Sequence, residues 1–177
     1  NAVMAWTLNV PENISLYEKW TAGIDERLAA AAIAQKSGYL VAFHFDPIIV
    51  HDGWQEHYSS LMERLARIIP PERVAWISLG CFRYSPGFKE IIKHQFPGEN
   101  LTTEEMFPGI DGKYRYLFNV RSSIYSFFYE KLNSIFPDTY VYFCMESSEM
   151  WKKVTGKNFT SSAELEESLC ASLERFI

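Results

Sequence analysis

The sequence predicts a parallel α/β protein in the form of an open half barrel, because three segments of the chain repeat one design. Each segment is an apolar strand whose last residues are polar, followed by a turn and an amphipathic helix. These strands are expected at residues 5–9, 39–46 and 74–80. Strands joined in this way pair in parallel, so their carboxyl ends meet at one edge of the sheet, where parallel sheets bind ligands.

Alternation within these strands sorts their side chains onto two faces. The bulky apolar side chains are expected to face the helices. They are Trp6, Leu8, Phe43, Phe45, Ile77 and Leu79. The opposite face is expected to line the hollow of the half barrel. Its members are Thr7, Asn9, His44, Asp46, Ser78 and Gly80. A polar interior with an apolar outer layer is therefore the predicted layout.

The helices after these strands are expected at residues 11–20, 24–37, 53–69 and 86–96. The second of them ends at Gly38, which suits a left-handed C-terminal cap. Proline stops the strand at Asp46-Pro47 because it has no backbone donor. In the fourth helix, Ser85 is expected to cap the first turn.

Residues 97–112 lack periodicity and contain Gly, Pro and acidic residues, which predicts a functional loop. The remaining elements are expected to be a helix at 120–136, a strand at 140–145 that ends before Glu146, and helices at 148–155 and 161–177. In the last helix, Ser161 and Glu164 have the spacing of a capping box. We interpret residues 1–177 as one domain that is a piece of a longer protein, with residues 1–2 as a cloning scar.

Composition limits the classes of function. The chain has 177 residues and a formal net charge of −5, which argues against broad phosphate binding and leaves room for a local nucleic-acid contact. Its three cysteines lie far apart and form no CxxC pair, which fits the reducing cytoplasm. No segment has the apolar length of a membrane span.

The polar strand ends predict a ligand site only as a group. A single hydroxyl or amide at a strand end more often caps the following turn, whereas several polar groups that converge would lack hydrogen bonds without a ligand or water. His44 and Asp46, with His51 and Asp52 nearby, match no specific metal signature. We therefore expect His44 to hold a hydrogen bond and predict no metal site.

A second constellation follows the loop at 97–112. Its cations could bind phosphates and its rings could stack on bases. Its members are Lys113, Tyr114, Arg115, Tyr116 and Arg121. The alternative is an ordinary hairpin whose edge is protected by Lys and Arg and whose tyrosines pack on the sheet. Composition by itself favours that alternative slightly.

Four segments resemble the spore photoproduct lyase family of radical S-adenosylmethionine enzymes. They are residues 5–12 (AWTLNVPE), 21–30 (TAGIDERLAA), 38–54 (GYLVAFHFDPII, then HDGW) and 76–80 (WISLG). The resemblance implies that this chain is the C-terminal half of a partial TIM-type (β/α)6 barrel, without the N-terminal half that binds the cluster, and that it carries a C-terminal helical and hairpin extension. It also implies a carbon-carbon lyase in which a four-iron four-sulfur cluster cleaves S-adenosylmethionine to a radical that splits a thymine dimer in DNA.

The resemblance also implies roles for residues. Thr7 and Asn9 match positions near the ribose and amino acid moiety of S-adenosylmethionine, and His44 and Asp46 face the same interior. Ser78 and Gly80 complete the cofactor set, near the adenine. The residues 113–116, with Arg121, match a hairpin that enters the DNA lesion. This chain lacks the CxxxCxxC cluster loop, so by itself it is expected to be inactive.

Two departures from the family leave alternatives open. His44 and Asp46 replace expected apolar residues, and residues 79–83 differ from their counterpart. The substrate could accordingly be a small molecule or RNA, and a different class of function is a non-catalytic α/β binding module. The sequence assigns no catalytic residue, hydrogen donor or oligomeric state.

Overall fold

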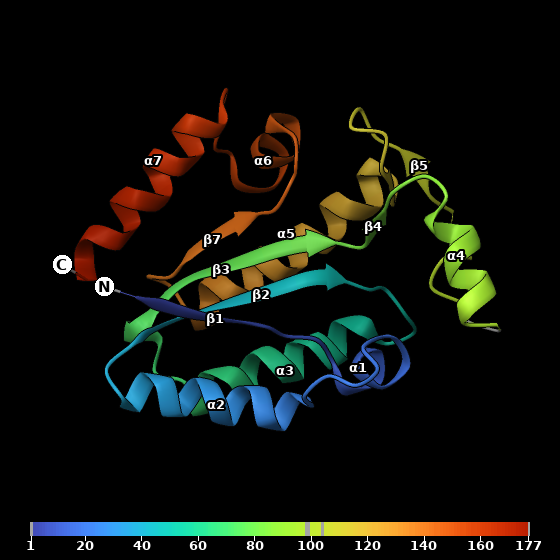
Figure 1. Ribbon diagram of the computed structural model, residues 1–177. Helices are drawn as coiled ribbons and strands as arrows, with labels where there is room; N and C mark the ends of the chain where they lie inside the picture. The colour runs from blue at the N-terminus through green and yellow to red at the C-terminus, as the bar shows by residue number, and fades with distance from the viewer. Residues whose placement is uncertain (1, 98–99, 104, 177) are drawn as a thin grey trace.

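A four-stranded parallel sheet forms the centre of the computed structural model, which describes residues 2–97, 100–103 and 105–176. Its strands are β1 (Val3–Thr7), β2 (Leu40–Ile48), β3 (Val74–Cys81) and β7 (Tyr140–Phe143), in the order β1-β2-β3-β7 (Figure 1). Every neighbouring pair is parallel. The predicted α/β class is confirmed, and in the described part of the chain the sheet stays open instead of closing into a barrel.

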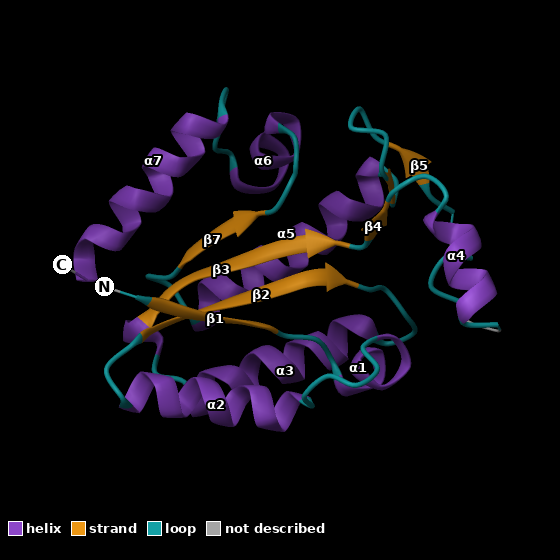
Figure 2. Ribbon diagram, in the orientation of Figure 1, coloured by secondary structure: helices purple, strands orange, loops and turns teal. Residues whose placement is uncertain are grey.

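Three long helices cover one face of this sheet (Figures 1 and 2). They are α2 (Ile24–Lys36), α3 (Trp54–Ile68) and α5 (Phe118–Ile135). The buried positions of α3 recur at helical spacing, which explains why this segment forms a helix that packs by one side. Those positions are Tyr58, Leu61, Met62 and Leu65.

The core lies between the sheet and these helices. Phe43 and Phe45 of β2 are fully buried on this side, and the ring of Phe45 contacts those of Tyr58 and Phe128. Each buried aromatic side chain stabilises the fold by about 1.5–3 kcal/mol relative to an exposed one. The predicted apolar face is thus confirmed on β2.

A smaller antiparallel sheet lies beyond the carboxyl ends of the parallel strands (Figure 1). Its strands are β4 (Arg83–Tyr84), β6 (Tyr114–Arg115) and β5 (Phe107–Pro108), in that order. The helix α4 (Phe88–Gln95) lies at the same end of the molecule. The predicted functional loop at 97–112 contains β5, while its residues 98–99 and 104 lie outside the described residues.

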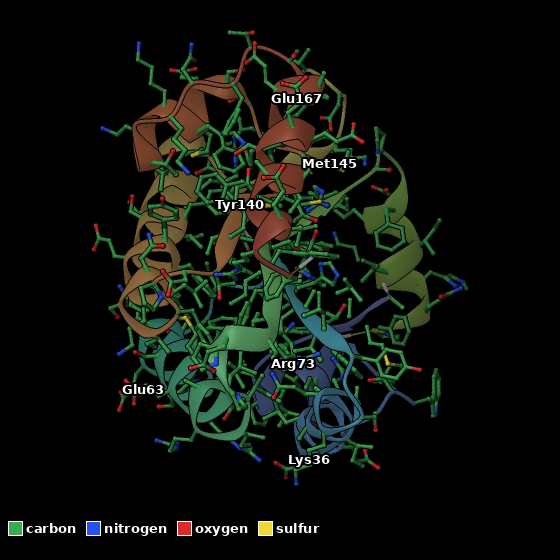
Figure 3. All side chains as sticks on the ribbon, turned by 90° about the vertical axis from the view of Figure 1, so that its left-hand side faces the viewer. Lys36, Glu63, Arg73, Tyr140, Met145 and Glu167 are labelled. Carbon is green, nitrogen blue, oxygen red and sulfur yellow. The ribbon has the colours of Figure 1, made fainter. Side chains whose placement is uncertain are left out.

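The chain ends in helices α6 (Ser148–Thr155) and α7 (Ser162–Leu173) and the short turn η2 (Glu174–Phe176). Figure 1 shows α7 across the sheet from α2 and α3, and Figure 3 shows Tyr140 of β7 next to α7. The hydroxyl of Ser161 accepts a hydrogen bond from the backbone N–H of Glu164, which is one half of the predicted capping box; the Glu164 carboxylate accepts from the N–H of Thr160 instead of Ser161. No helix among the described residues combines the length and hydropathy needed to cross a bilayer.

Several predicted boundaries are wrong. The strand expected at 5–9 covers Val3–Thr7, and the helix expected at 11–20 ends at Tyr17. The strand β2 continues through Pro47 to Ile48, because the ladder with β3 shifts register there and does not need the donor that proline lacks. The helix α4 begins at Phe88 after Gly87, whose φ of 81° is left-handed, and no side chain caps it, so Ser85 is not its cap. The short elements α1 (Pro11–Tyr17) and η1 (Pro71–Arg73) complete the fold.

Candidate functional site

One row of polar side chains crosses all four parallel strands. The register aligns Thr7 with His44, His44 with Ser78, and Ser78 with Tyr142. Alternation places this row on the face that the three long helices leave uncovered. The Nδ1 atom of His44 lies 2.5 Å from the hydroxyl oxygen of buried Ser78. Three of the predicted residues therefore lie together, and Tyr142 joins them.

The sequence prediction did not include Tyr142, because it rested on the polar residue at the end of this strand, Glu146. Tyr142 lies four residues before Glu146, and this even spacing is the signal that could have found it. Burial raises the pKa of the Tyr142 phenol, and the neighbouring Ser78 hydroxyl opposes that rise. The phenol is therefore protonated at neutral pH and can donate a hydrogen bond.

His44 supplies a neutral imidazole to this row. Burial lowers the pKa of His44, and the nearby Asp46 carboxylate only partly opposes this effect. Since Nδ1 faces Ser78, the other ring nitrogen remains available to a ligand as donor or acceptor, depending on the tautomer. The predicted hydrogen-bonding role of His44 agrees with this geometry.

Asp46 and Gly80 lie one step further toward the carboxyl ends of the strands. Arg83 donates from both terminal nitrogens to the Asp46 carboxylate, with N–O distances of 3.1 Å each. A Cβ atom at Gly80 would lie 2.5 Å from the Asp46 carboxyl carbon, so only glycine leaves space for this ion pair. Arg83 was missed because a single arginine after a strand has no distinctive spacing.

Asn9 lies away from the polar row, in contrast to the predicted alternation. The strand β1 ends at Thr7, so period-2 alternation stops before this residue. Its side chain is buried and donates to Glu18 and the carbonyl of Pro47, while its oxygen accepts from Tyr58 and Asn13. These partners use its hydrogen-bonding capacity within the protein.

The tyrosines of the hairpin pack on the protein. The rings of Tyr84 and Tyr114 are stacked, with centroids 5.4 Å apart and an interplanar angle of 9°. Tyr116 is buried in the core cluster. One face of the Tyr114 ring and the buried ring of Tyr116 are therefore covered by the protein, which supports the plainer alternative for these two residues.

Two of the predicted cations serve to hold the hairpin in place. Arg115 donates to both oxygens of Asp111 at 2.6 Å. Arg121 is buried and donates to Glu146 at 2.9 Å and to the carbonyl of Tyr116 at 2.5 Å. These two ion pairs neutralise both arginines, so neither offers an unopposed charge.

Lys113 differs from these arginines. Its Nζ contacts the sulfur of Met145 at 3.7 Å, and it forms no ion pair with any described carboxylate within 4.0 Å. Lys113 also lines a cavity of about 370 Å³ between the strand ends and the hairpin, together with Asp46 and Arg83. The cavity therefore lies between the polar strand ends, which include Asp46, and the basic hairpin, which includes Lys113.

The tip of the hairpin carries apolar side chains in contact with solvent. Ile110 is fully exposed, and Phe107 on β5 is also exposed. Exposed apolar side chains on a protruding turn are able to insert between bases, as wedges do in many DNA-binding proteins. Sequence reasoning missed both residues because the segment lacks periodicity.

The three cysteines do not form a metal centre. Cys81 is buried, and burial raises the pKa of its thiol to about 12, whereas Cys170 is exposed on α7. Within the described ranges, no group of three or more His, Cys, Asp or Glu side chains is arranged to hold a metal ion. These cysteines therefore do not fit the thiolate ligation that an iron-sulfur cluster requires.

Comparisons with known proteins agree on one family. The family model described as "Spore photoproduct lyase" matches residues 2–144. The spore photoproduct lyase of Bacillus subtilis (strain 168) is 29% identical over 102 residues, which cover 56% of this chain and 30% of that protein. The protein of the same name from Clostridium acetobutylicum is 22% identical over 142 residues, covering 77% and 42%. The chain thus spans less than half the length of these relatives.

Solved structures of the same name share the fold. A spore photoproduct lyase complexed with dinucleoside spore photoproduct has a TM-score of 0.71 and 26% identity, covering 80% of this chain and 44% of that one. A variant with bound AdoMet and the same dinucleoside has a TM-score of 0.70 and 25% identity over the same shares. Since the family model matches the whole parallel sheet and the hairpin, this chain belongs to the spore photoproduct lyase family.

Proposed function

We propose that this chain is part of a radical S-adenosylmethionine lyase that repairs a thymine-dimer lesion in DNA. The observation that carries the proposal is the row of Thr7, His44, Ser78 and Tyr142 on the open face of the sheet, directed to the same end as a protruding hairpin. A solved relative holds both AdoMet and dinucleoside spore photoproduct, which supports a shared site for cofactor and lesion.

The open face is suited to S-adenosylmethionine. Ser78 and Tyr142 offer hydroxyl groups and His44 a neutral imidazole, which match the nitrogen and oxygen atoms of adenine and ribose. On the same face, the indole Nε1 of Trp76 is buried and has no hydrogen-bond partner among the described residues. Buried donors are nearly always satisfied, so this indole also suits a ligand with an acceptor.

In the proposed reaction, S-adenosylmethionine would supply a carbon radical for removal of a hydrogen atom from the lesion, after cleavage of its C–S bond with one electron from an iron-sulfur cluster. The residues of this chain orient the cofactor, because the hydrogen bond between His44 and Ser78 fixes the polar row. The Asp46–Arg83 ion pair borders the cavity at the strand ends. We assign no residue of this chain to the iron-sulfur cluster, because its cysteines do not fit that role.

The hairpin is the proposed contact with DNA. The net charge of −5 opposes a broad electrostatic interface, so binding depends on a local contact. Ile110 at the tip supplies the apolar wedge and Lys113 the unpaired cation. This assignment moves the expected role from the tyrosines, which pack internally, to the tip of the turn.

The cofactor assignment is tested by isothermal titration of the full-length protein with S-adenosylmethionine. We expect Ser78→Ala to weaken binding about 2–10-fold, since it removes one hydrogen-bonding group beside His44. The matched control is Ser60→Ala, at an exposed position on α3. Undiminished affinity of the Ser78 variant would contradict the role of the row.

The substrate assignment is tested by fluorescence anisotropy with duplexes that differ only in the lesion. We expect tighter binding of the damaged duplex, and a loss of that preference in Ile110→Ser. Ile33→Ser is the control, because Ile33 is the same residue type and is also exposed, on α2. Equal affinity of the wild-type protein for both duplexes would overturn lesion repair and favour a different substrate.

A further inference from the structure

Trp20 is 96% exposed, although tryptophan has the largest apolar surface of the aromatic side chains. The φ angle of Trp20 is 62°, in the left-handed region that bulky residues rarely adopt. Such a conformation costs free energy and persists only where neighbouring contacts impose it, as they often do at ligand clamps. The fold therefore holds an uncovered aromatic ring at this position.

The turn that carries Trp20 is anchored on both sides. Glu18 accepts hydrogen bonds from Arg27 at 2.6 Å and from Asn9 at 3.1 Å. The hydroxyl of Thr21 accepts from Arg27 at 2.9 Å and donates to the carbonyl of Glu18 at 2.7 Å. Because this backbone is already ordered, a ligand that contacts the indole loses little conformational entropy in the turn.

An apolar groove of about 280 Å³ lies between α1 and α4, and Trp20 forms part of its wall. We call it the Trp20 groove. Its other apolar side chains include Leu16, Ile92 and Phe96. Phe88 lines both this groove and the cavity at the strand ends, so the two adjoin. Figure 1 shows α1 and α4 at the end of the molecule toward which the parallel strands point.

Lysines border the Trp20 groove. Lys19 lies in its wall, with Nζ 5.1 Å from the centroid of the Phe96 ring. An adjoining hollow of about 350 Å³ shares Lys19 and Phe96 with the groove. Among the described residues, neither wall contains a carboxylate, and Lys19 forms no ion pair within 4.0 Å. On α4, Lys89 and Lys93 outnumber the single carboxylate of Glu90. These observations favour an occupant with a negative charge beside an apolar group.

A nucleotide combines these two properties. Its base has a face that stacks on aromatic side chains, and its phosphate carries a negative charge. Aromatic rings beside cations are the usual means by which proteins bind unpaired nucleic acid without reading its sequence. An uncharged apolar peptide would cover the indole and leave Lys19 without an anion. The combination of Trp20 and Lys19 therefore favours a nucleotide.

We propose that the Trp20 groove binds an unpaired base of the DNA strand opposite the lesion, an inference that rests on the proposed function. An enzyme that draws a lesion out of the duplex leaves the opposite bases without partners. Stacking on Trp20 replaces part of the stacking that such a base has lost, and Lys19 contacts the adjoining phosphate. Trp20 thus stabilises the opened duplex without touching the lesion.

The experiment compares two undamaged duplexes by fluorescence anisotropy with the full-length protein. One duplex is fully paired. In the other, two adjacent abasic sites stand opposite two ordinary bases, which are therefore unpaired. We expect the second duplex to bind at least about fivefold more tightly, the lower limit for stacking of one base on an aromatic ring. Neither duplex contains a lesion, so the comparison measures the contact with unpaired bases.

Substitutions of Trp20 separate stacking from general apolar contact. Trp20→Leu removes the aromatic face and keeps an apolar side chain, so it should reduce the preference to less than about twofold. Trp20→Phe keeps an aromatic face and should retain most of the preference. Tyr39→Leu is the matched control and should keep the full preference, because Tyr39 is an exposed aromatic residue that precedes β2, at the opposite end of the sheet.

Lys19→Met tests the phosphate contact. It should weaken binding of the duplex with unpaired bases and lower the slope of log Kd against log salt concentration by about one, because one phosphate contact is lost. Lys152→Met, at an exposed position on α6, should change neither quantity. An unchanged salt slope in Lys19→Met would overturn nucleic acid as the occupant of the Trp20 groove.

The stacking contact is overturned if the wild-type protein binds both duplexes equally, or if Trp20→Leu retains the preference as fully as Trp20→Phe. A third duplex that carries the lesion tests the proposed function in the same assay. A preference for the lesion without a preference for unpaired bases would retain lesion repair and overturn the Trp20 contact. The reverse result would overturn lesion repair and leave the Trp20 groove as a site for unpaired bases.

Discussion

His44 provides a test of the polar row at the scale of one residue. Its pKa is lowered in the folded protein by burial, whereas in the unfolded chain it has its ordinary value of about 6.5. Between these two pKa values the unfolded state binds more protons, so the free energy of unfolding falls as the pH drops below about 6.5. Below the pKa of His44 in the folded protein, this histidine no longer lowers the free energy of unfolding.

We therefore expect His44→Gln to reduce the loss of stability between pH 7.5 and pH 5. Urea denaturation followed by circular dichroism at both pH values measures it. His94→Gln is the control, since His94 is exposed on α4. An identical pH dependence in the wild type and the His44 variant would show that this imidazole does not titrate differently on folding.

Gly80 provides a second test at this scale. In Gly80→Ala the new Cβ atom would lie 2.5 Å from the Asp46 carboxyl carbon, so the carboxylate must move away from Arg83. We expect a loss of stability of about 1–3 kcal/mol, as for other overpacked sites. Urea denaturation measures this loss.

A double-mutant cycle identifies the cause of the Gly80 effect. When Asp46→Ala is already present, the obstructing carboxylate is gone and Gly80→Ala should cost less. If the two effects simply add, the contact with Asp46 is not the reason that glycine is required.

At the scale of secondary-structure elements, Arg121 joins three parts of the fold. It lies on α5, donates to the carbonyl of Tyr116 at the end of the hairpin, and pairs with Glu146 just after β7. The ion pair is nearly buried, with side-chain exposures of 10% and 4%. The hairpin thus depends on a residue that the sequence suggested as a DNA ligand.

Arg121→Met should therefore destabilise the protein by about 3–5 kcal/mol, because it leaves a buried carboxylate without its partner. Arg64→Met is the matched control: Arg64 pairs with Asp25 at the surface, where loss of an ion pair costs about 0–1 kcal/mol. Denaturant unfolding measures both. A loss similar to that of the control would show that the Arg121–Glu146 pair does not organise the hairpin.

At the scale of the whole molecule, the C-terminal helices differ in how firmly they are joined to the core. The residues of α7 are all at least partly exposed, and the family match ends at residue 144. In contrast, Trp151 of α6 is buried, and its ring stacks on Phe143 with centroids 4.5 Å apart. Helix α6 thus belongs to the core, and α7 lies on its surface.

A chain that ends after Thr160, which removes α7, should remain folded and lose no more than about 2 kcal/mol, because little apolar area leaves the core. A chain that ends after Cys144 should lose more, since it also removes the buried Trp151. Thermal and urea unfolding compare the two. A larger effect of the first truncation would show that α7 is part of the core.

Local patterns account for much of what the sequence could predict. The period of two in β2 and β3 placed His44, Asp46 and Ser78 on one face, because alternation is a property of the extended backbone itself. Alternation gave the wrong face for Asn9, because β1 ends before that residue and the end of a strand depends on its pairing with β2. Alternation also could not identify Arg83, whose role depends on the contact of β4 with the carboxylate of Asp46.

The sequence by itself determined the α/β class, the parallel strand and helix repeat, the polar face and the resemblance to the family. These follow from short-range periodicity and from residue identity in order along the chain. Only the tertiary structure decided which charges are neutralised and which side chains are free. The arginines of the hairpin region pair with carboxylates and its tyrosines pack within the protein, whereas Lys113 has no carboxylate partner among the described residues and Ile110 is exposed. Ion pairing and burial join residues far apart in sequence, so no local pattern contains them.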